Sequence, residues 1–355
     1  MTEIPKDRIL ILDGAMGTMI RHVGCNDVMC LTHPDEIRAI HTAYLEAGAD
    51  IISTNSFNAN SFSLADYGMA DRVTEINAAA AAIAREAADS FMKLHPDRQV
   101  YVAGSVGPTN KTASMSPDVS DPARRDVTYD MLRGTYRQQI AALVSNGGDI
   151  ILIETVFDTL NAKAALHAAE DVRAELGTNF GIMLSVTVTE KGGRTFSGQT
   201  LEAFVASVAH APLMSLGLNC SFGPEEMLPV LRQLAAISPF PVSAHPNAGL
   251  PDASGCYAES PERMAAAISR FVSEGLVNIV GGCCGTTPAH IRLFPAIVDG
   301  ARPHTPVAPS PSSLRLSGLE ALEICPGSTF INVGERCNVC LLYTSPSPRD
   351  YAASR

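Results

Sequence analysis

An eightfold alternation of apolar runs and helical segments is the feature that most restricts how this sequence can fold. Each apolar run is short and rich in Ile and Val, and a longer segment with the apolar spacing of a helix follows it. This alternation is typical of repeated strand-helix units that build a parallel sheet. The runs begin at residues 9, 50, 100, 149, 181, 214, 241 and 278.

The number of units predicts how the sheet is arranged. Eight strand-helix units within about 300 residues match the size and strand count of a (β/α)8 TIM barrel. Two predicted helix starts, at Ser260-Pro261 and Thr287-Pro288, offer a hydroxyl N-cap followed by proline. An open, doubly wound sheet is the alternative, because periodicity does not show whether a sheet closes. We therefore expect an α/β chain with a (β/α)8 barrel over residues 1–300.

The composition changes after residue 300. Residues 301–325 contain several Pro and Ser residues and are interpreted as a linker. Residues 326–340 are expected to begin a second domain that is cut short. Residues 341–355 have no periodicity, and we expect them to be disordered or foreign to the natural protein.

Charge and cysteine content restrict the class of function. The formal net charge is -11, and no basic run is longer than Arg124-Arg125, which argues against a nucleic-acid or anionic membrane surface and favours a small-molecule partner. No apolar run is long enough for a signal peptide or for the ~18 residues of a membrane helix, so we expect a cytoplasmic protein. In that compartment the nine cysteines, an odd number, are expected to be thiols or metal ligands.

The active site of such a barrel lies at the carboxyl ends of the strands. Polar residues at those ends are therefore the candidates for binding or catalysis. They are Asp13, Asn55, Ser105, Glu154, Asn219, Cys220, His245, Asn247, Cys283 and Cys284.

Three of these candidates, Cys220, Cys283 and Cys284, predict a zinc site. Soft sulfur ligands favour zinc over magnesium or calcium, and three thiolates with a fourth position open are typical of a catalytic site. The glycines beside Cys283 and Cys284 would let both side chains turn toward one ion. For Cys220, burial in the core is an alternative interpretation. For Cys283 and Cys284, a redox disulfide between the two is an alternative. His245 could complete a closed site, but we prefer a place for it behind the ligands or in the substrate pocket.

The remaining rim residues suit a zwitterionic substrate that carries a thiol. An ion with three thiolates is a weak Lewis acid, yet it promotes loss of a proton from a fourth, substrate thiol. The backbone of Gly14, Ala15, Met16 and Gly17 could form a nest for a carboxylate, while Asp13 and Glu154 could hold an ammonium group. An ordinary turn is the alternative interpretation of Asp13-Gly14.

At this point the sequence resembles a known family. The motifs ILILDGAMGTMI, STNSF, GSVGPTN, ETVFDTLNAKAA, GRTFSGQT, LGLNCSFGP, SAHPNAGLP and VGGCCGTTPAHI are similar to the homocysteine-binding barrel of the cobalamin-dependent methionine synthases, within the wider homocysteine methyltransferase family. The resemblance implies that Cys220, Cys283 and Cys284 are catalytic zinc ligands. It also implies that Asp13, Glu154 and the backbone of residues 14–17 bind L-homocysteine, and that Asn55, Asn219 and Asn247 line its pocket.

The reaction implied by this resemblance is methyl transfer from methylcobalamin to the zinc-bound thiolate of L-homocysteine, which gives L-methionine. In the full-length enzymes 5-methyltetrahydrofolate regenerates the methylcobalamin. Residues 329–339, TFINVGERCNV, resemble the first strand of the pterin-binding domain, in which Asn338 would approach the pterin. We expect cobalamin and methyltetrahydrofolate to be bound by domains that this chain lacks. The alternatives are a methyltransferase that uses betaine or S-methylmethionine, and a non-catalytic module that binds homocysteine and zinc.

Overall fold

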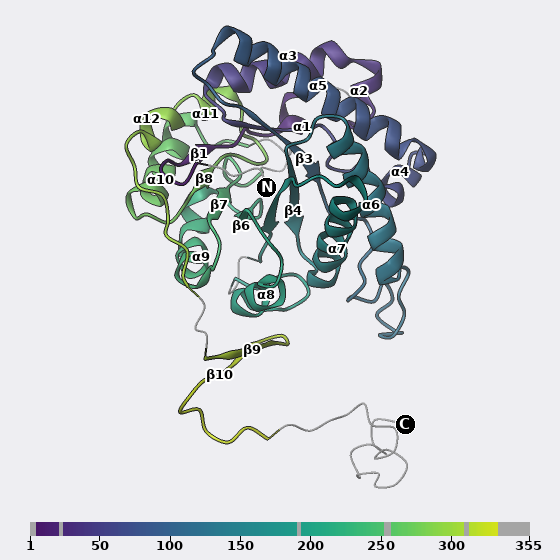
Figure 1. Cartoon of the computed structure of the whole chain (residues 1–355), viewed down its shortest axis with the longest axis vertical. Helices are drawn as coiled ribbons and strands as arrows, with labels where there is room; N and C mark the ends of the chain where they lie inside the picture. The colour runs from purple at the N-terminus through teal and green to yellow at the C-terminus, as the bar shows by residue number, and fades with distance from the viewer. Residues whose placement is uncertain (1–4, 21–23, 190–192, 252–256, 309–311, 333–355) are drawn as a thin grey trace. The chain divides into compact units, whose positions relative to one another are not determined.

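The computed structural model describes residues 5–20, 24–189, 193–251, 257–308 and 312–332 (Figure 1). Eight strands form one sheet in the order β1-β8-β7-β6-β5-β4-β3-β2, and every hydrogen-bonded pair is parallel. The strands are β1 (Leu10–Ile11), β2 (Ile51–Ser53), β3 (Tyr101–Val106), β4 (Ile150–Val156), β5 (Gly181–Val186), β6 (Ser215–Asn219), β7 (Val242–His245) and β8 (Ile279–Val280).

The first and last strands in this order also meet. Leu12 forms a parallel bridge with Ile51, and the amide of Asp13 donates to the carbonyl of Ile51 over 2.9 Å. The sheet therefore closes on itself, which confirms the predicted (β/α)8 barrel and excludes the open, doubly wound alternative. Closure also brings the carboxyl ends of all eight strands to one mouth.

Helices follow the strands and surround them (Figure 1). The longer ones are α3 (Pro34–Ala47), α5 (Val73–Leu94), α6 (Tyr129–Ser145), α7 (Thr159–Leu176), α8 (Leu201–Val208), α9 (Pro224–Ile237) and α10 (Pro261–Ser273). The shorter ones are α1 (Met16–Met19), α2 (Met29–Thr32), α4 (Ser61–Ala65), η1 (Ala70–Arg72), α11 (Pro288–Ile291) and α12 (Phe294–Val298). The predicted start at Thr287 is confirmed by a capping box with His290, and the side chain of Ser260 caps α10.

An apolar cluster fills the interior of the barrel toward the amino ends of the strands. Its buried members are Leu10, Leu12, Ile51, Ala103, Ile150, Leu152, Met183, Met214 and Ile279. A second and larger cluster packs the outer face of the sheet against the helices. Because this cluster makes part of the interior apolar, a polar site is expected at the carboxyl ends of the strands.

The chain continues along the barrel after α12. The amide of His304 donates to the carbonyl of Val277 over 3.0 Å, and that of Val307 donates to Ser238 over 2.8 Å. Two strands, β9 (Leu314–Ser317) and β10 (Ala321–Ile324), then pair as a hairpin, and residues 315–322 belong to the same compact unit as the barrel. The predicted linker range thus contains ordered structure that its composition did not indicate.

The predicted boundaries of the domains, at residues 300, 325 and 340, stay predictions. Residues 326–332 form no helix or strand, and residues 333–355, which include Asn338 and the predicted tail, lie outside the described residues. Within the described part of the chain, none of the helices has the length and apolar character needed to cross a membrane.

Candidate metal centre

Backbone hydrogen bonds join the three loops that carry the predicted zinc cysteines and their neighbours. The amide of Cys220, directly after β6, donates to the carbonyl of His245 at the end of β7 over 3.1 Å. The amide of Cys283, after β8, donates to Pro246 over 2.8 Å, and that of Ala248 donates to Cys284 over 2.8 Å. The ladder between neighbouring strands thus continues into the loops and places Cys220 beside the Cys283-Cys284 pair.

The sulfur atoms of Cys220, Cys283 and Cys284 all lie within 4.8 Å of one another. The Sγ atoms of Cys220 and Cys284 are 3.9 Å apart. A tetrahedral zinc ion with bonds of about 2.3 Å separates its sulfur ligands by about 3.8 Å. The donor atoms therefore fit a single zinc ion, whereas a disulfide requires sulfurs about 2.05 Å apart.

The backbone is strained where it delivers Cys220. Cys220 and Ser221 have φ values of 59° and 62°, in the left-handed region that residues other than glycine rarely adopt. The amide of Phe222 donates back to the carbonyl of Cys220 over 2.6 Å, which makes the turn tight. Such a conformation costs on the order of 1–3 kcal/mol per residue and is found mainly where function requires it.

Asn219, the last residue of β6, ties this turn to β4. Its amide nitrogen donates to Thr155 Oγ1 over 2.8 Å, and its oxygen accepts from the amide of Thr155 over 2.9 Å. The same nitrogen is 3.9 Å from Cys283 Sγ. Thr155 has a φ of 57°, unusual for a β-branched residue, and it directly follows Glu154. Asn219 thus orients a cysteine and also fixes the strand end that carries Glu154.

Without a metal the three thiols share their protons unequally. Hydrogen bonds from Cys283 and Cys284 hold the pKa of Cys220 well below its usual range, and the same interactions raise the pKa values of Cys283 and Cys284. Asn247, after β7, also hydrogen-bonds to Cys220 through its side chain. Of the three thiols, Cys220 is therefore the one that loses its proton most readily.

His245 is buried next to this cluster but outside it. The three cysteines are the only group of metal-binding side chains brought together in the described part of the chain, and His245 is not among its members. Burial lowers the pKa of His245 to about 3, so the ring is neutral. His245 therefore does not join the three cysteines as a fourth ligand in this structure, and its place behind the ligands or in the substrate pocket stays a prediction.

Two residues that the sequence did not point to also contact the centre. The hydroxyl of Tyr257 hydrogen-bonds to Cys284, and its ring packs on Gly285, where an added Cβ would lie 2.3 Å from Tyr257 Cβ. Thr286 Oγ1 donates to the carbonyl of Cys283 over 2.6 Å and accepts from the amide of Ala15 over 3.0 Å. The φ of Gly285 is 79°, and the presence of a glycine at this position could have suggested a positive φ. Its contact with Tyr257 had no signal in the sequence.

Two carboxylates also lie at the mouth, Asp13 just after β1, where its carbonyl accepts from the amide of Gly282 over 3.0 Å, and Glu154 on β4. Asp13 accepts from the amide of Ser53 over 2.7 Å and from its hydroxyl over 2.9 Å. Glu154 accepts from the hydroxyl of Ser105 over 2.6 Å. Burial raises the pKa of Asp13 to about 8 and that of Glu154 to about 7, and the negative charge of Glu154 adds to the shift of Asp13. Asp13, which is buried, and Glu154, which is half-buried, are therefore both suited to bind a cation.

The structure divides the predicted carboxylate nest. The amide of Ala15 already donates to Thr286. Met16 and Gly17 are the first two residues of α1, and the first amides of a helix have no acceptor within that helix. Gly14 has no room for a side chain, because a Cβ there would lie 2.6 Å from Thr286 Oγ1 and 2.9 Å from the Tyr44 ring. Asn55 donates to the carbonyl of Asn26 over 2.8 Å, so its side chain holds the loop before α2.

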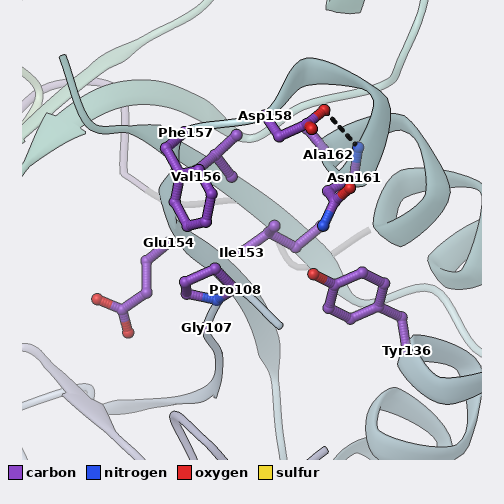
Figure 2. Close-up of a pocket in the computed structure, with 10 residues that line it drawn as sticks. All are labelled: Gly107, Pro108, Tyr136, Ile153, Glu154, Val156, Phe157, Asp158, Asn161 and Ala162. Atoms are coloured by element: carbon purple, nitrogen blue, oxygen red, sulfur yellow. Dashed lines mark hydrogen bonds between the residues drawn. The ribbon is translucent and has the colours of Figure 1, made fainter. Parts of the chain in front are cut away.

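A small cavity lies beside Glu154 (Figure 2). It has a volume of about 10 Å³, enough for about one water and too small for an amino acid. Figure 2 shows the Glu154 side chain pointing away from Asp158 and Asn161, which lie on the opposite wall. Asp158 caps α7 and accepts from the amide of Ser114 over 3.1 Å, so this wall fixes the long loop after β3.

Comparison with known proteins agrees with this geometry. Residues 10–298 match the model of the homocysteine S-methyltransferase family. The fold is similar to that of the homocysteine methyltransferase MmuM from Escherichia coli in its oxidized form, with 22% identity, a TM-score of 0.66, and coverage of 81% of this chain and 95% of that one. The metallated form of the same enzyme has 24% identity and a TM-score of 0.65 over 82% of this chain and 96% of that one. The family match covers most of the sequence, and the chain therefore belongs to the homocysteine S-methyltransferase family.

Proposed function

We propose that this chain binds one zinc ion through Cys220, Cys283 and Cys284 and transfers a methyl group to the thiol of L-homocysteine, giving L-methionine. The observation that carries the proposal is the convergence of three sulfur atoms, from loops more than 60 residues apart, within 4.8 Å of one another. A metallated form is also known for the E. coli enzyme with a similar fold.

Zinc held by three thiolates would supply a position at which a substrate thiol loses its proton at neutral pH and stays nucleophilic. The protein's part is to set the geometry. The strained turn at Cys220 and the amide of Asn219 direct two of the sulfurs, while Tyr257 contacts the third. A centre of free thiols needs a reducing compartment, which supports the cytoplasm.

Asp13 and Glu154 are the proposed partners of the homocysteine ammonium group. Burial raises the pKa values of both carboxyls. A bound ammonium would return them to the charged form and would hold the amino acid with its thiol toward the cysteines. The amides of Met16 and Gly17 are the remaining candidates for the substrate carboxylate, and Asn247 is proposed to line the pocket beside Cys220. For Asn219 and Asn55 we propose a supporting role, since both amides are engaged with the protein.

The proposed methyl donor is methylcobalamin, which 5-methyltetrahydrofolate would regenerate. The support is the set of motifs shared with the cobalamin-dependent methionine synthases, together with the pterin-domain resemblance of residues 329–339. Betaine or S-methylmethionine is the second candidate donor. The geometry supports such a donor equally well, because the cysteines and both carboxylates are proposed to contact homocysteine and not the methyl donor.

The test compares the full chain with Cys283→Ser and with the control Cys25→Ser, a half-buried thiol outside the cluster. Metal analysis should find one zinc per chain in the wild type and the control and a loss of zinc in Cys283→Ser. Each protein is then incubated with homocysteine and one donor at a time: methylcobalamin, betaine or S-methylmethionine. Methionine should form from methylcobalamin only. Full activity in a zinc-free variant would contradict the zinc site, and methionine from another donor would replace the proposed one.

A further inference from the structure

The hairpin after the barrel holds the loop between β5 and α8. We call residues 315–322 the hairpin clasp and residues 193–200 the β5-α8 loop. The carbonyl of Leu319 accepts from the amide of Thr200, the N-cap of α8, over 2.9 Å. Ser317 Oγ donates to the carbonyl of Ala203 over 2.7 Å and lies 2.7 Å from Ser207 Oγ. Arg194 also forms an ion pair with Glu320. The clasp therefore contacts both the loop and the first turns of α8.

Gln199 extends this contact toward the mouth of the barrel. Its Nε2 donates to the carbonyl of Gly318 over 2.7 Å, and its Oε1 accepts from the hydroxyl of Thr159, the first residue of α7. Thr159 is only 8% exposed, so this end of the bridge is protected from water. One amide side chain thus connects the clasp to the start of α7.

A second connection runs beside the first. The amide of Ser197 donates to the carbonyl of Phe157 over 3.3 Å, and the rings of Phe157 and Phe196 meet edge to face with centroids 6.1 Å apart. Phe157 follows β4 directly and borders the same cavity as Glu154 (Figure 2). The β5-α8 loop therefore supports the strand end that presents Glu154.

We propose that the hairpin clasp is a positioning element of the homocysteine site, acting through Gln199 and Thr159 on the end of β4. This inference rests on the proposed function, in which Glu154 binds the substrate ammonium group. It assigns to residues after the barrel a role in substrate affinity, and it gives any domain that follows the hairpin a route by which to alter that affinity.

The experiment uses the zinc-loaded full chain and two readouts, the homocysteine Kd from calorimetry and amide hydrogen exchange at residues 157–160. Gln199→Glu keeps the acceptor for Thr159 but loses the donor to Gly318, and Thr159→Val removes the donor to Gln199. Each should raise the Kd about tenfold, a typical size for coupling between sites, and should speed exchange at residues 157–160. Thr159→Ser keeps the hydroxyl and should bind as the wild type does. Zinc content should stay the same in all variants.

Gln138→Ala is the matched control, since Gln138 is an exposed amide on α6 that bonds only Thr74 among the described residues. The proposal is overturned if Gln199→Glu and Thr159→Val leave both the Kd and the exchange rates at the control's values. A wild-type chain that binds no homocysteine would refute the proposed function instead. In that case the exchange rates in Gln199→Glu still decide whether the clasp positions the end of β4.

Discussion

Replacing Asp13 with asparagine should make the substrate-free protein more stable at alkaline pH and should weaken the proposed binding of substrate. Asp13 is 2% exposed, accepts two hydrogen bonds from Ser53, and pairs with no basic side chain in the described part of the chain. Its pKa rises from the ordinary 3.8 to about 8 because burial disfavours the charged form. The folded state therefore keeps a proton that the unfolded chain has lost, and the stability falls as the pH rises between these two values.

The magnitude follows from the two pKa values. At about 1.4 kcal/mol for each tenfold change in proton affinity, the penalty is about 5 kcal/mol at pH 8 and about 2 kcal/mol at pH 5. Asparagine removes the penalty but loses one of the two strong hydrogen bonds from Ser53, worth about 2 kcal/mol. Asp13→Asn should thus be about 3 kcal/mol more stable than the wild type at pH 8 and about equally stable at pH 5.

Urea unfolding of both proteins at pH values from 5 to 9, without substrate, measures this difference. Homocysteine titrations of the same samples should show a Kd raised about thirtyfold or more, since a buried ion pair loses one partner. A stability difference that does not vary with pH would refute the reasoning, because the charge would then carry no penalty. A variant less stable than the wild type at pH 8 would show that Asp13 serves the fold and not a ligand.

Two further substitutions test the packing and the buried charge. Gly217→Ala should lower the free energy of unfolding by about 3 kcal/mol or more, because its Cβ would lie 2.0 Å from Ser243 Oγ and 2.3 Å from Ser243 O. Gly134→Ala on α6 is the control, because a Cβ there would have no atom within 4 Å. In the same urea titrations it should raise the free energy of unfolding by up to about 1 kcal/mol. A neutral Gly217→Ala would show that β6 and β7 can separate. Burial lowers the pKa of His41 from 6.5 to about 4, so the unfolded chain gains a proton below pH 6.5 that the folded chain does not. Between pH 7.5 and 5 the wild type should therefore lose about 2 kcal/mol relative to His41→Phe, and parallel pH profiles for the two proteins would contradict this.

The barrel could be predicted because its strands and helices have strong local signals. The apolar runs that become β3 to β6 are buried on both faces, so they contain few polar residues to obscure them. Closure could not be predicted from any local pattern. Closure depends on the pairing of Leu12 with Ile51 and on the pairing of β1 with β8. The apolar periodicity of the sequence does not indicate that these residues pair. The hairpin at residues 314–324 was also missed, because the Pro-rich and Ser-rich composition before it is typical of linkers.

The convergence of Cys220, Cys283 and Cys284 could be predicted because the barrel topology alone brings the ends of β6 and β8 to one mouth. Asp13 and Glu154 were found for the same reason, as carboxylates at strand ends. Contacts of single side chains follow no such rule. That Asn55 and Asn219 line the pocket stays a prediction, and the sequence did not indicate that one amide would bond Asn26 and the other Thr155. Tyr257 was missed because its loop position carries no sequence signal for a contact with Cys284.

The strain in the site explains why these contacts matter together. Thr155 and Cys220 both have left-handed φ values, and each would relax to an ordinary conformation if nothing held it. Asn219 joins them, with two hydrogen bonds to Thr155 and a position directly before Cys220. Because Glu154 precedes Thr155, one asparagine holds both the strand end that presents the proposed ammonium partner and the turn that presents Cys220, a proposed zinc ligand. If homocysteine binds as proposed, β4 and β6 together set the distance between its ammonium group and its thiol, and the closed sheet around both strands holds the strained residues in place.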